Sequence, residues 1–244
     1  QDIASSYFEP NRIAKIFLGI AMALVEIKVI LDFMCPWSFI GLRSMQLARE
    51  RYASQLNFAV EFVPFEYDAP GKYPPEGTDW SEYCNSFGPT KAKFLLEEKL
   101  PRAFAIGKEL GIEFRLDRRI VHTVDVNTAL LVAQRHHVAE RFAELTLAAH
   151  FEQLEDPNDT KALASRLEAL NVAPDELMEA LKDPEKEARN WERTQEVRPS
   201  LRSGVPQFEI RCGGADLCAE AVGGPTSPTY FEEIFEKCLS RPEL

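Results

Sequence analysis

A single cysteine near the start of the chain stands in a sequence context that favours thiol chemistry. Cys35 follows a stretch of alternating apolar residues and directly precedes Pro36, a residue type favoured in the first turn of a helix. A cysteine at such a junction faces unpaired backbone N–H groups and the positive end of the helix dipole, which can lower its pKa to roughly 3.5–7.5. Cys35 is therefore the candidate nucleophile, and Ser38, one helical turn further on, is placed to hydrogen-bond its thiolate.

Two strands and a helix are predicted around this cysteine. Residues 25–33 alternate between apolar and mostly polar side chains, and this period of two predicts a strand. After the cysteine, Leu42, Met45, Ala48 and Tyr52 recur at the spacing of an amphipathic helix. Residues 57–67 alternate again and lead into the turn-forming segment 68–71. The predicted order of strand, helix and strand places Cys35 where the first strand meets the helix.

A helical segment follows and separates these strands from the end of the chain. Pro89, Pro174 and Pro184 fall where helices begin. Strand character returns at residues 204–210, followed by a hairpin turn at Gly213 and Gly214 and a final helix at residues 228–240. The helices predicted in the middle segment are 78–87, 89–110, 125–137, 139–155, 159–170, 174–182 and 184–197.

The composition is that of a globular and acidic chain. Its 244 residues carry a formal net charge of −11, with 45% hydrophobic and 27% charged residues. The apolar content suffices for a packed core, whereas the negative charge would repel a phosphate backbone. The longest apolar run, residues 16–25, falls short of the about 20 residues that a membrane-spanning helix needs. We therefore expect neither nucleic acid nor a membrane as a partner.

Five cysteines are present, and their odd number argues against a framework of disulfides in a chain of this length. Cys238 falls on the apolar face of the last helix, and Cys84 lies in the helical segment. Cys212 and Cys218 flank the Gly-Gly turn and are expected to face each other across the hairpin. A reducing compartment, the cytoplasm, follows as the expected location.

The first 24 residues are predicted to be a leader or a disordered tail. Arg12 and Lys15 precede an apolar stretch that ends in small residues, so a secretory or organellar signal is the alternative to a cytoplasmic location. Asp2 and Glu9 weaken that alternative, because the segment ahead of the apolar stretch of a signal peptide is positively charged.

These features, in this order, resemble the DsbA family of thioredoxin folds, and most closely its FrnE-like branch. A strand is followed by Cys-Pro-Trp-x and a helix, then by a long helical insertion, and then by Gly-Val-Pro-x-Phe at residues 204–208. Asp32 before the motif, and Asn127 and Thr128 in the insertion, fit the same branch. The resemblance covers about residues 25–240 and implies an α/β, thioredoxin-like fold with a long helical insertion. The thioredoxin-like domain would consist of residues 25–72 and 197–244, and the insertion of residues 73–196.

The resemblance also implies which residues bind a substrate. Pro206 would belong to a cis-proline loop opposite Cys35, and Val205 would offer its backbone to a substrate chain. Pro36 and Trp37 would border the groove. Two simpler interpretations stay open, because Trp37 could pack on its own helix and Pro206 could open an edge strand with a trans peptide bond.

The motif departs from the family at one position. An oxidoreductase of this family has Cys-x-x-Cys, whereas here the second cysteine is replaced by Ser38. Without a resolving thiol, a mixed disulfide on Cys35 must be cleared by glutathione or another external thiol. The expected activity is that of a monothiol oxidoreductase acting on protein thiols and disulfides, with no bound cofactor and with glutathione as a co-substrate.

Other functions stay open. The loss of the second cysteine would suit a redox-inactive module that binds a peptide or partner protein in the same groove. Kappa-class glutathione transferases and 2-hydroxychromene-2-carboxylate isomerase are related groups that carry Ser at the position of Cys35 and bind glutathione. Their Gly-x-Asp-Arg segment is missing here, where residues 223–227 are Gly-Gly-Pro-Thr-Ser. The four histidines show no metal-ligand spacing, so no metal site is expected, and the oligomeric state is left open.

Overall fold

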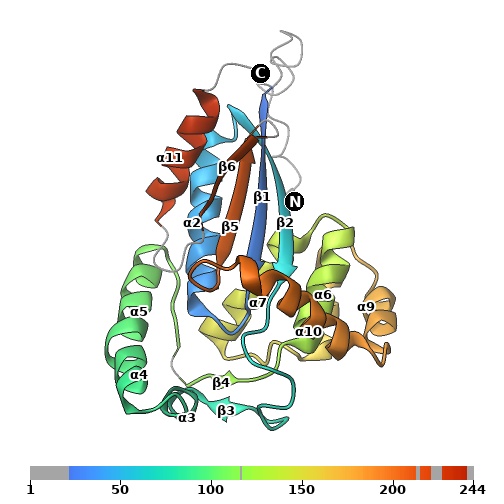
Figure 1. Cartoon of the computed structure of the whole chain (residues 1–244). Helices are drawn as coiled ribbons and strands as arrows, with labels where there is room; N and C mark the ends of the chain where they lie inside the picture. The colour runs from blue at the N-terminus through green and yellow to red at the C-terminus, as the bar shows by residue number, and fades with distance from the viewer. Residues whose placement is uncertain (1–21, 116, 213–214, 221–226, 241–244) are drawn as a thin grey trace, which may run out of the picture.

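The main sheet joins the two ends of the chain. The computed structural model describes residues 22–115, 117–212, 215–220 and 227–240, and for residues 215–220 it describes the backbone. The strands are β1 (Ala23–Leu31), β2 (Leu56–Pro64), β5 (Gln207–Cys212) and β6 (Ala215–Glu220), in the order β2-β1-β5-β6 (Figure 1). β2 runs parallel to β1, and β5 runs antiparallel to it. The predicted strands at residues 25–33 and 204–210 thus share one sheet, as the expected fold requires.

The strands of this sheet begin and end a few residues away from the predicted positions. β1 begins at Ala23, so the last residues of the expected tail already belong to the sheet, while residues 1–21 lie outside the described part of the chain. β2 ends at Pro64, the proline expected to end it, because the ring removes the backbone N–H that the ladder would need. The predicted Gly213–Gly214 turn also lies outside the described residues.

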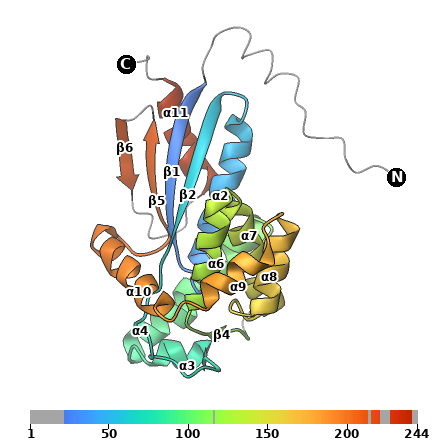
Figure 2. The same cartoon turned by 90° about the vertical axis from the view of Figure 1, so that its right-hand side faces the viewer.

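Two helices cover one face of the sheet. α2 (Pro36–Tyr52) and α11 (Pro228–Leu239) lie side by side there (Figures 1 and 2). The alternation of β1 points Val25, Ile27 and Val29 into the core, where each is at most 1% exposed. Phe231 and Phe235 of α11 belong to the same core. A smaller apolar cluster involves the end of β1 and consists of Ile30, Val63 and Phe65 packed by Val197, Leu201 and Val205.

The helical insertion is present, with two local differences from the prediction. The helix expected at residues 89–110 contains a π-helical segment, η1 (Phe94–Lys99), between α4 (Pro89–Lys93) and α5 (Leu100–Glu109). Two short strands, β3 (Thr78–Asp79) and β4 (Arg119–Ile120), pair with each other and had no alternating pattern to predict them. The other helices are α3 (Trp80–Asn85), α6 (Val124–Arg135), α7 (Ala139–Gln153), α8 (Thr160–Ala169), α9 (Pro174–Leu181), α10 (Lys186–Val197) and the 3-10 turn η2 (Arg198–Ser200).

The insertion elements fall into two groups around the sheet. α6 packs on β2, and α7, α8, α9 and α10 gather around α6 (Figure 2). The segments α3, α4 and α5, with the β3–β4 pair, lie beyond the ends of β1 and β2 (Figure 1). This second group therefore faces the start of α2, where Cys35 lies.

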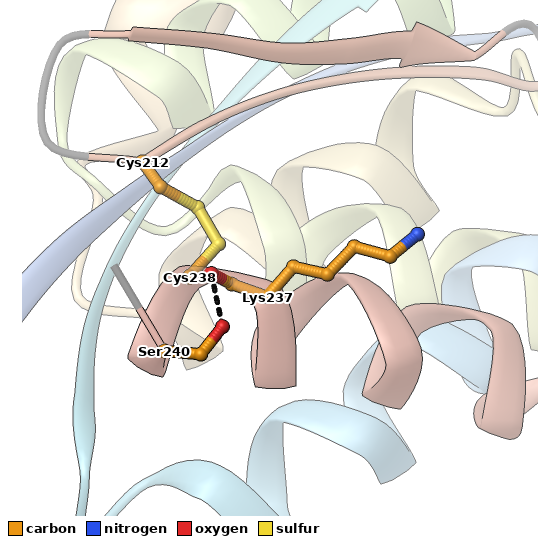
Figure 3. The surroundings of a disulfide bond; sticks show 4 residues. All are labelled: Cys212, Lys237, Cys238 and Ser240. Carbon is orange, nitrogen blue, oxygen red and sulfur yellow. Dashed lines mark hydrogen bonds between the residues drawn. A yellow bond between two sulfur atoms is a disulfide. The ribbon is translucent and has the colours of Figure 1, made fainter. Parts of the chain in front are cut away.

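A disulfide joins the sheet to the last helix. Cys212 at the end of β5 bonds Cys238 of α11, with 5.6 Å between their Cα atoms (Figure 3). The expected pairing of Cys212 with Cys218 is wrong, because the hairpin register places Ala215 opposite Cys212. The prediction that Cys238 lies in the helix core is confirmed by its 4% exposure.

Among the helices in the described part of the chain, none is both long enough and apolar enough to cross a bilayer.

Candidate functional site

Cys35 is the N-cap residue of α2. Its backbone is extended, with φ −91° and ψ 114°, and Pro36 occupies the first helical position. No acidic residue lies in the first turn of the helix. The backbone N–H of Ser38 donates to the carbonyl oxygen of Cys35 at 2.9 Å, and the N–H groups of Trp37 and Ser38 act to lower the pKa of the Cys35 thiol. The local sequence thus places a free, half-buried thiol at the positive end of α2.

The loop before β5 lies directly against this thiol. The Val205–Pro206 peptide bond is cis. Cys35 Sγ donates a hydrogen bond to the carbonyl oxygen of Val205 at 3.4 Å. Gly41 makes the close approach possible, since a Cβ at that position would lie 2.9 Å from Pro206 Cγ and 3.0 Å from the ring of Phe208. Residues separated by about 170 positions are therefore brought into contact by the packing of α2 on β5.

The side chain of Ser38 faces away from the cavity beside Cys35. It is 1% exposed, and its Oγ accepts a hydrogen bond from the backbone N–H of Asp32 at 3.2 Å. Trp37 is 7% exposed and also lines the cavity, so its side chain both packs in the core and borders the groove. Pro36 lines the cavity as well, whereas the ring of Pro206 is buried against Gly41.

Asp32 is a buried carboxyl beside the thiol, and the sequence identified it only as part of the motif. It is 4% exposed and accepts hydrogen bonds from the backbone N–H groups of Met34 at 2.7 Å and Tyr67 at 3.2 Å. Burial raises the pKa of Asp32 to about 7, against the opposing effect of these hydrogen bonds. This carboxyl therefore changes charge near neutral pH.

The expectation of a lowered thiol pKa is not met in this structure. Burial raises the pKa of Cys35, and the negative charge of Asp32 raises it further. The N–H groups of Ser38 and Trp37 and the charge of Lys99 lower it by less. Desolvation of the thiol therefore outweighs the N–H groups and the cation at the start of α2.

A cavity of about 520 Å³ opens beside Cys35. One wall comes from the motif and the cis-proline loop, and the other from the insertion. The insertion contributes aromatic rings from α3, Trp80 and Tyr83, and a cation from η1, Lys99. The wall from the insertion could not be predicted, because nothing in the sequence of α3 or η1 indicates which side of each helix faces the cavity.

Glu66, another acid of the cavity, is hydrogen-bonded to two groups of the insertion. Glu66 accepts a hydrogen bond from the backbone N–H of Thr123 at 3.2 Å and lies 2.6 Å from Nδ1 of His122. Nε2 of His122 accepts a hydrogen bond from the backbone N–H of Tyr73 at 3.2 Å. The ring proton is therefore on Nδ1, which donates a hydrogen bond to Glu66. Burial raises the pKa of Glu66. His122 thereby fixes the segment before α3 to the end of β2.

Arg118 is a buried cation that hydrogen-bonds the residue before Cys35. It is 4% exposed, and Nη1 donates to the carbonyl oxygen of Met34 at 3.2 Å. Its guanidinium lies over Trp80, 4.5 Å from the ring centroid, and over Phe151 at 4.7 Å. A buried arginine of this kind links the loop of Cys35 to the insertion. Within the described residues, no group of three or more His, Cys, Asp or Glu side chains is arranged to hold a metal ion.

Fold and site together define a thioredoxin-like protein with a thiol at a helix start, opposite a cis-proline loop. The chain belongs to the family of the DSBA-like thioredoxin domain, whose model matches residues 26–235. No curated protein matches the chain.

Solved structures with the same fold agree with this assignment. A probable DsbA oxidoreductase from Streptomyces coelicolor is 19% identical, with a TM-score of 0.69 over 90% of this chain and 92% of that chain. The cytosolic disulfide reductase DsbM from Pseudomonas aeruginosa is 13% identical, with a TM-score of 0.58 over 88% and 98%. A 2-hydroxychromene-2-carboxylate isomerase is also 13% identical, with a TM-score of 0.57 over 80% and 86%. At these identities the likeness concerns the fold.

Proposed function

We propose that this protein is a thiol–disulfide oxidoreductase that works through Cys35 alone. The observation that carries the proposal is the position of Cys35: a free thiol at the start of α2, 3.4 Å from the Val205 carbonyl, beside an open cavity. Family membership and the disulfide reductase among the structural neighbours support this choice. The substrates would be protein disulfides and thiols, with glutathione as co-substrate and no bound cofactor.

The reaction would take place in two exchanges. The Cys35 thiolate attacks one sulfur of a disulfide, forms a new S–S bond with it and releases the other sulfur as a thiolate. A glutathione thiolate then attacks the substrate sulfur of this mixed disulfide, forms a second mixed disulfide and returns Cys35 as a thiolate. The proton of the resting thiol passes to Asp32 or to water, and a carboxyl with a pKa of about 7 suits that transfer at neutral pH.

The neighbours also support parts of the proposal that concern partners and location. DsbM from Pseudomonas aeruginosa has also been solved with GSH, which agrees with glutathione as the second thiol. The same protein is titled cytosolic, and we propose the cytoplasm for this chain as well.

A glutathione-coupled assay tests the activity. We expect the wild-type protein to catalyse the reduction of bis(2-hydroxyethyl) disulfide by glutathione, and Cys35→Ser to abolish this turnover. Cys84→Ser is the matched control, because Cys84 is also a free cysteine and is fully buried. Loss of activity in the Cys84 variant with retention in the Cys35 variant would refute the proposal.

One observation favours a second candidate, a module that binds a peptide or partner in the groove without redox chemistry. Burial raises the pKa of Cys35 instead of lowering it, and its S–H group already has an acceptor in the Val205 carbonyl. If the wild-type protein shows no turnover and Cys35 forms no mixed disulfide, this second function replaces the first.

A further inference from the structure

The cavity beside Cys35 is lined by three basic residues, although the chain as a whole has a net charge of −11. They are Lys91 of α4, Lys99 of η1 and Arg202 of the loop before β5. In the described part of the chain none of them forms an ion pair. Lys91 lies over the ring of Phe87, 4.1 Å from its centroid. These positive charges are therefore available to a ligand.

The acids of the same cavity, in contrast, are engaged by groups of the chain itself. Asp68 contacts the ammonium of Lys72 and the hydroxyl of Tyr73, and it accepts a hydrogen bond from the hydroxyl of Tyr83 at 3.1 Å. Asp32 is buried under two backbone N–H donors, and Glu66 is bound by His122 and Thr123. A cationic ligand would find no uncommitted carboxylate among these residues.

One of these cations lies in the π-helical segment η1 and lines the cavity. π-bulges inside helices shift the side chains that follow them and occur frequently at functional sites. In η1 the shift accompanies the placement of Leu95 and Lys99 on the cavity wall. The charge of Lys99 acts on Cys35, whose pKa it lowers. Lys99 is thus placed to act on a ligand bound at the sulfur as well.

We propose that this cavity selects anionic disulfides, meaning disulfides with carboxylates close to their sulfur atoms, for exchange with Cys35. The inference rests on the proposed function and adds the chemical class of the substrate. Cations without an acidic partner in a concave site create a local positive potential that attracts anions despite the negative charge of the whole molecule. The aromatic rings of Trp80 and Tyr83 leave room for an apolar part of the same ligand.

A set of small disulfides of similar size and different charge tests the selection. We would measure the rate of mixed-disulfide formation on Cys35 with 3,3′-dithiodipropionate, bis(2-hydroxyethyl) disulfide and cystamine, which are anionic, neutral and cationic. Each rate is divided by the rate with a free cysteine peptide, which removes intrinsic reactivity. At low salt we expect the normalised rate of the anionic disulfide to exceed that of cystamine about tenfold, and a salt concentration of about 1 M to reduce this ratio toward one.

Variants assign the effect to the cations. Lys99→Met with Arg202→Met should bring the normalised ratio of the anionic to the cationic disulfide close to one. Lys93→Met is the matched control, because Lys93 is an exposed residue of α4 that lies outside the cavity and near Glu97. It should leave the ratio unchanged.

The outcomes separate this inference from the proposed function. Equal normalised rates for all three disulfides, or a ratio that the double variant leaves intact, would overturn the selection while leaving thiol exchange in place. No reaction with any disulfide would overturn the proposed function and this inference with it.

Discussion

The cysteines at the two ends of the sheet differ in bonding, exposure and surroundings. At the end of β1, Cys35 is a free, half-buried thiol beside an open cavity, and its neighbours include a carboxyl, a backbone carbonyl and a cation. At the end of β5, Cys212 is 6% exposed and bonded to Cys238, which is 4% exposed. Both of these residues belong to the apolar core. Access and polar surroundings therefore distinguish Cys35, the proposed nucleophile, from the bonded pair.

The largest change in activity is expected when a second thiol is introduced at position 38, next to Cys35. Position 38 is one helical turn after Cys35, so Ser38→Cys can form the intramolecular disulfide that the motif lacks. Because the effective concentration of such a thiol reaches millimolar or more, we expect dithiol-type reduction of insulin with dithiothreitol to increase about tenfold or more. Ser44→Cys, further along α2, should give no increase. If the disulfide between positions 35 and 38 forms in the Ser38→Cys variant and activity stays at the wild-type level, the groove lacks more than a thiol.

Removing the structural disulfide should affect stability alone. The pair closes a loop with a sequence separation of 26 residues, so the double variant Cys212→Ala and Cys238→Ala should lose about 2–4 kcal/mol of unfolding free energy under oxidising conditions. Denaturant unfolding measures this loss. The rate of mixed-disulfide formation on Cys35 should stay at the wild-type value, and a large drop in that rate would show that the two ends of the sheet are coupled.

A pH-dependent difference is expected from Asp32. Its folded pKa of about 7 lies above the ordinary pKa of 3.8, so the unfolded chain loses this proton first as the pH rises. The contribution of this group to stability therefore falls between about pH 4 and 7 and levels off above pH 7. Relative to wild type, Asp32→Asn should gain about 2–3 kcal/mol of stability between about pH 5 and pH 8.

Denaturant unfolding of both proteins at these two pH values checks the Asp32 prediction. A difference between them that does not depend on pH would contradict the raised pKa. Removal of the carboxylate should also lower the pKa of Cys35, which the pH dependence of alkylation would report.

The smallest effect is expected where α2 meets the cis-proline loop. Gly41→Ala would place a methyl group 2.9 Å from Pro206 and 3.0 Å from Phe208, so the loop must move. We expect a loss of about 1–2 kcal/mol in unfolding free energy and slower thiol exchange, because the contact between Cys35 and Val205 depends on this packing. Ser44→Ala, which adds no atom to the same helix, serves as the comparison. Wild-type stability in Gly41→Ala would mean that the loop tolerates displacement.

The sequence predicts the main strands and helices better than it predicts the environment of the candidate site. The alternation at residues 25–33 and the helical spacing after Pro36 are local patterns, and both elements are present. The π-helical segment was missed because Phe94–Lys99 has ordinary helical composition, and the shift depends on tertiary contacts. The pairing of Cys212 was missed because it depends on hairpin register and on how α11 crosses the sheet.

For the site, the motif predicted that Cys35 lies against the Val205–Pro206 loop, but it did not predict the electrostatics. Cys35 and Val205 lie in contact, as the resemblance implied. The buried state of Asp32 and the presence of Arg118 behind the motif arise from segments distant in sequence. Burial decides the direction of the Cys35 pKa, and burial cannot be judged from residue spacing.

The most direct test of the central claim follows the sulfur of Cys35 itself. The protein is incubated with oxidised glutathione, and intact-mass and peptide mass spectrometry locate any glutathionyl group before and after the addition of reduced glutathione. We expect one glutathionyl group on Cys35, its removal by reduced glutathione, and none in Cys35→Ser. A wild-type protein whose Cys35 stays unmodified, or whose mixed disulfide resists reduced glutathione, would contradict the central claim.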